Sequence, residues 1–289
     1  MNLLLVGLDR RPGATRGGRP DTIIVASFSE EAGHVGLVSV PRDLYVDIPG
    51  YGSDRINATA AAAVKLEQDP AELLERVVEE TLDVPIAHTI VIDLGGFERA
   101  IDAIGGVEVD VPCAIADNFI DPRQPSQRRA LDIDTGRQYM NGATAAMYVR
   151  SRHGRSDWSR ARRQQAVLLG IKRRLLSAEG LTRAPALLDQ LVRLISTDMS
   201  RAQILGLAAR MVAIEPKNIH GLVIGHRETE GLIKYGKSVL LPKPAAIRAK
   251  LDALFSAAAP GAIPEHATCP AKEVALAHVS ESTAASAAK

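Results

Sequence analysis

The chain has 289 residues, 46% of them hydrophobic, which is enough to build one large buried core or two small ones. Its 35 Lys and Arg residues balance its 34 Asp and Glu residues, so the surface as a whole carries no field that attracts nucleic acid or an anionic membrane. Aromatic residues make up only 3%, which argues against base stacking with single-stranded nucleic acid. Any basic binding site must therefore be local.

Cysteine usage and apolar runs exclude further classes. Cys113 and Cys269 lie far apart and in no metal-ligand spacing, so we expect neither a disulfide scaffold nor a zinc site, while a single disulfide between them stays open. The first apolar stretch, residues 3–6, is too short for a signal peptide, and no run approaches the roughly 20 apolar residues of a membrane-spanning helix. We expect a soluble globular chain as written, without a transmembrane anchor.

Strand and helix patterns alternate through the first 111 residues. An aliphatic run at 2–8 ends at Asp9, a loop rich in Gly, Pro and Arg follows at 10–20, and Asp21 opens a second strand at 22–28. The remaining strands are expected at 34–48 with a bend at Pro41, 86–94 and 107–111, and helices at 58–66, 71–82 and 97–104. This alternation predicts an α/β domain with a central sheet.

The second half reads mainly as helices. Residues 114–138 are polar and lack a clear period, so we expect a long surface excursion. The elements expected downstream are helices at 141–148, 158–176, 184–195, 201–212 and 243–255 and a strand at 220–224. Beyond residue 257 the Ala, Pro and Ser composition predicts a disordered tail at 258–289.

Residues 148–165 contain six arginines and one acid. Such a run is often a solvated surface, and that alternative stays open. In a helix that starts at residue 156 or 157, however, Arg160 and Gln164 share a stripe with apolar residues, so they point to where the helix meets the interior. A charge there is unfavourable unless an anion or acid pairs with it. Three other arginines fall on the opposite face and are expected at the surface: Arg162, Arg173 and Arg174.

Arg150 and Arg152 are two residues apart, so in an extended segment both side chains leave the same face and can converge on one target. Guanidinium groups suit phosphate oxygens, because they are always charged and bind in a bidentate manner. This spacing favours a phosphate clamp. The alternative is a pair of arginines that satisfy carbonyls and carboxylates at the end of a sheet.

Asp9 and Asp21 lie at the end of one strand and the start of the next, so adjacent strands can bring the two carboxylates together. A hard divalent cation with phosphate oxygens would relieve their repulsion, whereas turn-forming or capping aspartates are the alternative. Arg42 follows an apolar strand, at the strand end where ligand sites of α/β proteins form. A lone arginine there can also be structural.

Several ordered motifs make the chain resemble the catalytic domain of the LytR-CpsA-Psr family, cell-envelope proteins also described as transcriptional attenuators. The motifs over residues 2–176 are Leu5-Val-Gly-Leu-Asp9, Arg19-Pro-Asp21-Thr22, Val40-Pro-Arg42-Asp43, Tyr45-Val-Asp-Ile-Pro-Gly50, Arg55-Ile-Asn57-Ala, Asp93-Leu-Gly-Gly-Phe97, Gly105-Gly-Val-Glu-Val109 and Tyr148-Val-Arg150-Ser-Arg152-His153 leading to Asp157, Arg160 and Arg163-Gln-Gln. Residues 240–255 resemble the closing segment of the family. The resemblance therefore implies one catalytic domain at 1–257, of which 177–257 is the less distinctive part.

The resemblance implies a three-layer α/β/α sandwich around a mixed central sheet, with an apolar channel for a polyprenyl chain. It implies transfer of a phosphate-linked glycopolymer from a polyprenyl pyrophosphate carrier to a peptidoglycan sugar hydroxyl, at the extracytoplasmic face of the plasma membrane, which the protein meets through its lipid substrate. Four aliphatic segments have the composition of a channel lining, 60–64, 73–78, 101–104 and 167–176, although ordinary core explains them equally.

Site residues carry over from the family by matching motif positions. Asp9 and Asp21 match the acids associated with Mg²⁺ (or Mn²⁺). The matches to the pyrophosphate binders are Arg19, Arg42, Arg150, Arg152, Arg160 and Gln164. Phosphoryl transfer depends mostly on positioning and charge stabilisation, so we expect Arg42, Arg152 and Arg160 to be catalytic, with Asp43 as the acceptor of the hydroxyl proton.

Two other functions use the same residues. If water replaces the sugar hydroxyl, the protein is a polyprenyl pyrophosphate phosphatase. If no bond is broken, it is a module that binds polyprenyl phosphate or regulates envelope genes. A DNA-binding regulator is disfavoured, because the charge is near neutral and no helix-turn-helix signature occurs.

Overall fold

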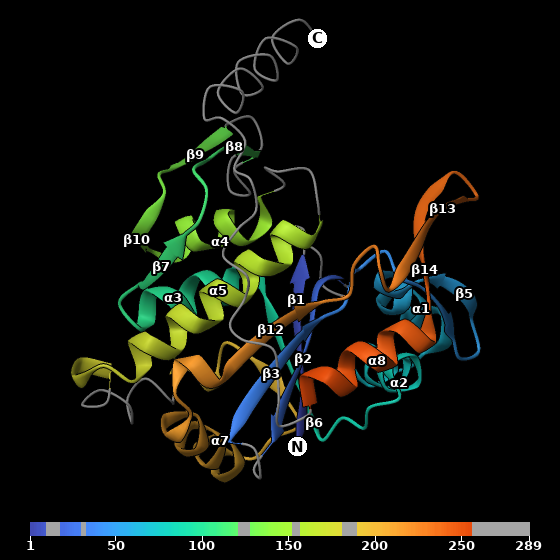
Figure 1. The fold of residues 1–289 in the computed structure, drawn as a ribbon, viewed down its shortest axis with the longest axis horizontal. Coiled ribbons are helices and arrows are strands. Elements are labelled where there is room, and N and C mark those ends of the chain that lie inside the picture. The colour runs from blue at the N-terminus through green and yellow to red at the C-terminus, as the bar shows by residue number, and fades with distance from the viewer. Residues whose placement is uncertain (10–17, 30–32, 121–127, 152–156, 181–189, 256–289) are drawn as a thin grey trace, which may run out of the picture. The chain divides into compact units, whose positions relative to one another are not determined.

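A computed structural model describes residues 1–9, 18–29, 33–120, 128–151, 157–180 and 190–255 (Figure 1). The described residues fold as two compact units, the first formed by Met1–Gly96 with residues 192–255 and the second by Phe97–Leu191. Each unit has its own cluster of buried aliphatic side chains. Arg152, the predicted tail at 258–289 and most of the predicted helix at 184–195 lie outside the described residues.

The first unit is built on a mixed sheet with the strand order β11-β6-β1-β2-β3-β12. Its strands are β1 (Asn2–Asp9), β2 (Arg19–Ser29), β3 (His34–Ser39), β6 (His88–Asp93), β11 (Ser196–Thr197) and β12 (Ile219–Val223). β1 is parallel to β6 and β3 to β12, while β2 runs antiparallel to both β1 and β3. Four strands therefore end at the same edge of the sheet, where β2 begins. This confirms the predicted α/β class with a mixed central sheet.

Helices α1 (Thr59–Leu66), α2 (Pro70–Leu82) and α8 (Pro244–Phe255) pack on this sheet through the first core. Helix α2 begins at Asp69, whose carboxylate accepts the amides of Ala71 (2.8 Å) and Glu72 (3.1 Å), with Pro70 at the first helical position. Its apolar stripe is fully buried, and each such side chain contributes roughly 2 kcal/mol. The predicted helices at 58–66, 71–82 and 243–255 are confirmed.

Two hairpins lie beside the sheet. The first is β4 (Tyr45–Ile48) with β5 (Gly52–Arg55), as the predicted turn after residue 48 requires. The second, β13 (Thr229–Lys234) with β14 (Lys237–Pro242), was not predicted. Its turn residues Tyr235 and Gly236 both have positive φ, 50° and 73°, which matches the tight turn that the twist of a hairpin favours. The Tyr-Gly pair was its one signal in the sequence.

The second unit combines α3 (Leu94–Ala103), β7 (Val107–Val111), β8 (Ile115–Ile120), β9 (Arg128–Ile133), β10 (Gly136–Met140), α4 (Gly142–Arg150) and α5 (Asp157–Leu175). The predicted surface excursion at 114–138 is wrong, because β8 and β9 form a hairpin and β10 pairs with β7. Ile115, Leu131 and Ile133 are buried in the core of this unit. Charged residues between these apolar positions hide the alternation in the sequence.

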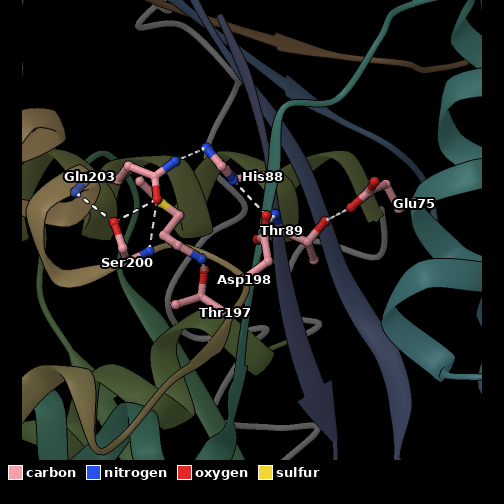
Figure 2. A network of polar contacts seen from close by, with 8 residues as sticks. Glu75, His88, Thr89, Thr197, Asp198, Ser200 and Gln203 are labelled. Atoms are coloured by element: carbon pink, nitrogen blue, oxygen red, sulfur yellow. Dashed lines mark hydrogen bonds and ion pairs between the residues drawn. The ribbon is translucent and has the colours of Figure 1, made fainter.

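Helix α7 (Arg201–Ala213) is fastened to the start of β6 by a polar network (Figure 2). His88 Nδ1 lies 2.5 Å from Asp198 Oδ2, and Asp198 Oδ1 accepts the amide of Thr89 at 2.9 Å. On the other side of the ring, His88 Nε2 lies 3.0 Å from the side-chain nitrogen Nε2 of Gln203. Gln203 also forms a capping box with Ser200 at the start of α7. This constellation is an anchor rather than a catalytic triad, because Gln203 separates the histidine from the serine.

Burial raises the pKa of Asp198, but hydrogen bonds from His88 and from the Thr89 amide outweigh this and hold its pKa below the usual range. A carboxyl with a lowered pKa stabilises the fold above its unfolded pKa of about 3.9, and the contribution disappears as the pH falls through the folded value. We expect Asp198→Asn to lower the free energy of unfolding by about 0.5–1 kcal/mol at pH 7, a small effect because the group is solvent-screened.

Urea unfolding of both proteins between pH 7 and pH 2.5 measures this difference. It should shrink below about pH 4, whereas Glu230→Gln, at an exposed acid of the same unit, should change little. A difference that stays constant down to pH 2.5 would contradict the assignment to Asp198.

Of the helices in the described ranges, none combines the length and apolar character needed to cross a bilayer.

Candidate active site

Asp9 and Asp21 lie on neighbouring strands at the carboxyl edge of the sheet. In the β1–β2 ladder Gly7 faces Thr22 but Leu8 faces Pro20, so Asp21 is the extra residue of a β-bulge. The strand β2 begins at Arg19, three residues before the predicted start. Bulges redirect side chains and are frequent beside active sites. The prediction that adjacent strands carry the two acids is confirmed, and Arg19 pairs with Asp9 in the ladder, both on the surface.

Arg42, just beyond β3, points back to the bulge. Its Nη1 donates to Asp21 Oδ2 at 2.9 Å, and its own carbonyl accepts the amide of Asn57 at 3.2 Å. The Arg42 side chain is 16% exposed and that of Asp21 is 26% exposed. The structure thus brings together a residue predicted to bind phosphate and one predicted to bind metal. Asp21 holds the guanidinium in place at a strand end that solvent can still reach.

Asp43 connects two arginines. Its Oδ2 lies 3.7 Å from Arg42 Nε, and its Oδ1 accepts Nη1 of Arg55 at 3.0 Å. The result is a chain of alternating charges, Asp21-Arg42-Asp43-Arg55, which we call the ion-pair chain. Sequence reasoning placed Arg55 in a motif with Ile56 and Asn57 but did not assign it to the site. Its signal was this motif, and only the β4–β5 hairpin brings it to Asp43.

Asp21 Oδ1 is buried and has no hydrogen-bond partner among the described residues. A buried carboxylate oxygen without a partner is unfavourable, and a hard divalent cation would satisfy it. Asp21 therefore fits a ligand of the Mg²⁺ or Mn²⁺ that the family resemblance implies, and Asp9, on the neighbouring strand, stays the predicted second carboxylate. The described residues contain no cluster of three or more His, Cys, Asp or Glu side chains that could hold a metal, so water and substrate oxygens would complete the coordination.

Arg150 is the last residue of α4, so the extended segment predicted for it is wrong at this position. The helix continues two residues past its predicted end because Tyr148 and Val149 still pack against the second unit. The Arg150 guanidinium lies 5.6 Å from the ring centroid of Phe119 on β8. Ser151 then leaves the helix with extended geometry, and its hydroxyl donates to Asp117 Oδ2 at 2.8 Å.

Helix α5 closes the C-terminal end of α4. Arg163 donates from Nε to the carbonyl of Tyr148 at 3.1 Å and from Nη2 to the carbonyl of Ser151. Gln164 donates more weakly to the carbonyl of Val149, at 3.4 Å. Burial lowers the pKa of Arg163 to about 10. Arg163 was in a predicted motif but was not assigned to the predicted site. Its two hydrogen bonds fix the backbone at the end of α4, directly before Arg152 in the sequence.

Arg160 is 7% exposed, which confirms that it points to the interior side of α5. Its binding to pyrophosphate stays a prediction, as does that of Gln164. The expectation that Arg173 and Arg174 are plain surface residues is wrong. Arg173 donates to Asp110 Oδ2 at 2.7 Å, and Arg174 Nε donates to the carbonyl of Ile104 at 2.7 Å, so both fasten α5 to neighbouring elements of the second unit.

Tyr148 is completely buried, and its hydroxyl has no hydrogen-bond partner among the described residues. Burial raises its pKa to about 12. We expect Tyr148→Phe to increase the free energy of unfolding by about 1 kcal/mol at pH 7, because the desolvated hydroxyl is removed. A raised folded pKa gives stability that is lost as the pH rises from about 10 to 12, so the advantage of the variant should grow over this range.

Denaturant unfolding at pH 7 and pH 11 measures the effect. Tyr235→Phe is the control, because Tyr235 is 94% exposed and loss of its hydroxyl should change stability by only a few tenths of a kcal/mol. Marked destabilisation of Tyr148→Phe would mean that the hydroxyl does have a partner.

Most aliphatic residues of the four segments considered for a lipid channel belong to the two cores, whereas Val64 is 53% exposed. The described members include Ala62, Leu73 and Val77 in the first core and Ile101 and Val167 in the second. This confirms the alternative that they are core residues. The channel itself stays a prediction.

The sequence profile of the LytR_cpsA_psr family matches residues 1–248. The chain belongs to the LytR-CpsA-Psr family. This LytR-CpsA-Psr chain is 31% identical over 238 residues to a protein of Oceanobacillus iheyensis named polyisoprenyl-teichoic acid–peptidoglycan teichoic acid transferase TagU, covering 81% of the chain and 70% of the relative. The protein of the same name from Enterococcus faecalis is 31% identical over 204 residues, 69% of the chain and 61% of the relative. The matched region thus spans only about 60–70% of these relatives.

A solved structure has the same fold. The crystal structure of B. subtilis TagV superposes on this LytR-CpsA-Psr chain with a TM-score of 0.71 at 23% identity, covering 88% of the chain and 96% of TagV. At this identity the similarity establishes the fold alone.

Proposed function

We propose that this LytR-CpsA-Psr protein transfers a phosphate-linked glycopolymer from a polyprenyl pyrophosphate carrier to a sugar hydroxyl of peptidoglycan. The observation that carries the proposal is the ion-pair chain at the carboxyl edge of the sheet, which holds Arg42 between Asp21 and Asp43. The names of the two relatives, which describe transfer from a polyisoprenyl carrier to peptidoglycan, support it.

In this reaction the hydroxyl oxygen of the acceptor forms a bond to the phosphorus next to the glycan, and the bond to the polyprenyl phosphate breaks. Asp21 and Asp43 orient Arg42, whose guanidinium would then bind pyrophosphate oxygens without reorganisation. Asp43 is our candidate for taking the hydroxyl proton, because it lies beside Arg42. In the second unit, Arg150, Arg152, Arg160 and Gln164 are further residues that we propose to bind pyrophosphate oxygens.

Asp9 and Asp21 would hold the divalent cation, which neutralises charge on the pyrophosphate when bound. We expect Mn²⁺ to bind the wild-type protein and Asp21→Asn to weaken this binding about tenfold or more, because the amide keeps the shape but loses the charge. Isothermal titration with Mn²⁺ measures the affinity without any need for turnover. Asp47→Asn is a matched control on the exposed side of β4. Equal affinity of wild type and Asp21→Asn would remove Asp21 from the metal site.

Product analysis with a polyprenyl pyrophosphate-linked glycan separates the proposed functions. Transfer requires that glycan phosphate appear on peptidoglycan together with free polyprenyl phosphate. Release of glycan phosphate at the same rate without peptidoglycan would identify a phosphatase instead. Binding of the lipid with no release of polyprenyl phosphate would leave a non-catalytic binding or regulatory protein.

The location we propose is the extracytoplasmic side of the membrane, where the carrier lipid and peptidoglycan meet. Cys113, between β7 and β8, is disulfide-bonded. Structural disulfides persist in oxidising compartments and are rare in the cytosol, which supports this location. Nucleic acid is not expected as a partner, since the charges of the chain balance.

A further inference from the structure

The β13–β14 hairpin carries the two most exposed large apolar side chains among the described residues of its unit, and a third exposed one beside them. Tyr235 is 94% exposed, Ile233 is 76% exposed and Leu232 is 42% exposed. These three residues with Lys234, Gly236 and Lys237 form what we call the hairpin tip. Scattered single apolar residues are normal on a surface, but three within four consecutive positions of one structural element are a patch.

The hairpin tip is held out on an ordered support. The two strands pair over six positions, from Thr229 with Pro242 to Lys234 with Lys237. At the base Val239 is buried, and the amide of Leu240 donates to the carbonyl of Asp43 at 2.9 Å. Figure 1 shows the hairpin projecting from the first unit. Ordered pairing that ends in exposed apolar side chains indicates a surface that meets another apolar phase.

Two lysines flank the turn directly opposite each other in the ladder. Like charges at facing positions repel each other, and each of these lysines has a partner on the β4–β5 hairpin. Lys234 Nζ lies 4.2 Å from the centroid of the Tyr45 ring, and Lys237 Nζ lies 3.4 Å from Asp54 Oδ2 with half of its side chain exposed. The Tyr45 ring carries no charge and the Lys237 side chain is half exposed, so both ammonium groups can still meet an anionic surface beside the apolar tip.

We propose that the hairpin tip inserts into the interface of a bilayer that contains anionic phospholipid. Tyr235 and Ile233 enter the boundary between head groups and acyl chains, and Lys234 and Lys237 contact the phosphates of the head groups. This inference rests on the proposed function, because a carrier lipid must be met at a membrane. The bond from Leu240 to Asp43 connects the hairpin directly to the ion-pair chain, so docking would hold Arg42 near the surface from which the pyrophosphate of the carrier projects.

Vesicle co-sedimentation of the full chain tests the proposal. Vesicles of phosphatidylcholine with about 30% phosphatidylglycerol, a content that gives a strongly negative surface, should bind the protein, while pure phosphatidylcholine should bind it more weakly. We expect Ile233→Ser with Tyr235→Ser to weaken binding to the anionic vesicles roughly tenfold or more, because both apolar contacts are lost. Lys234→Gln with Lys237→Gln should abolish the preference for anionic vesicles.

Val64→Ser is the matched control, since Val64 is 53% exposed on α1 of the same unit and should bind vesicles like wild type. Equal binding by wild type and the Ile233/Tyr235 variant would overturn the proposal. A second result would also overturn the proposal: the wild type self-associates without lipid, and the Ile233/Tyr235 variant does not. That result would identify a second copy of the chain as the partner of the hairpin tip.

Transfer from a short-chain donor in detergent separates this inference from the proposed function. The hairpin variant should keep wild-type transfer there, because it contacts only the membrane. Vesicle binding by a protein without any transferase activity would refute the proposed function and leave the docking surface intact.

Discussion

Replacing Arg42 by alanine is expected to reduce the rate of glycopolymer transfer by about 10²–10³-fold, the usual effect of removing one preorganised group that stabilises developing charge. Arg42 is the residue of the first unit that links Asp21, the acid proposed to bind the cation, to Asp43. Without it, the pyrophosphate loses a cation, Asp21 loses its ion-pair partner, and Asp43 keeps only Arg55 among the residues that the structure describes. The measurement is the initial rate of transfer to peptidoglycan, with saturating donor to separate kcat from KM.

Two variants make this test specific. Arg42→Lys should restore only part of the activity, because an ammonium group cannot contact Asp21 and phosphate oxygens with fixed fork geometry. Arg76→Ala, on the exposed side of α2, removes one guanidinium from the same unit and should leave the rate unchanged. Wild-type kcat in Arg42→Ala would exclude Arg42 from the site. The same assay on Arg160→Ala tests the predicted pyrophosphate binding by Arg160.

Replacing Arg163 by alanine is expected to lower the free energy of unfolding by about 3 kcal/mol, because charged hydrogen bonds to two carbonyls are lost inside the protein. The carbonyls of Tyr148 and Ser151 would be left without this donor at the end of α4. For a chain of this size the midpoint of thermal unfolding should fall by roughly 6–12 °C. Calorimetry or circular dichroism measures the shift.

Arg128→Ala is the control for this experiment, since Arg128 is an exposed arginine on β9 of the same unit. Its midpoint should change by about 1 °C or less. Arg163→Lys should recover little stability, because a single ammonium group cannot reach both carbonyls with the same geometry. A thermal midpoint of Arg163→Ala equal to that of wild type would show that other groups satisfy this helix end.

Local signals in the sequence predict the elements whose structure depends on neighbouring residues. The start of α2 follows from Asp69 and Pro70, and the direction of Arg160 follows from the apolar stripe of α5. The acids on adjacent strands follow from their positions at two strand ends. In each of these cases the cause lies within a few residues of the predicted feature.

Features that depend on distant contacts could not be predicted in this way. Ile115 and Leu131 are buried because β8 pairs with β9. The two strands lie far enough apart along the chain that the hydrophobic periodicity of either one does not predict their pairing. In the sequence, Arg173 and Arg174 have no partner nearby and therefore resemble two solvent-exposed arginines. In the structure, β7 supplies a carboxylate and a carbonyl oxygen, and the residue after α3 supplies another carbonyl oxygen. The role of Arg55 likewise depends on a hairpin that returns it to Asp43.

Asp21 stands at a bulge, and this has a consequence for how such proteins change over time. The ladder between β1 and β2 pairs the residues on either side of Asp21, and the core side chains of β2 lie beyond it. A chain that lacks this one extra residue can therefore keep its sheet and its buried interior. Descendants can thus lose the acid, and with it the chemistry, while they still fold, so a recognisable fold in a relative is no evidence of a working enzyme.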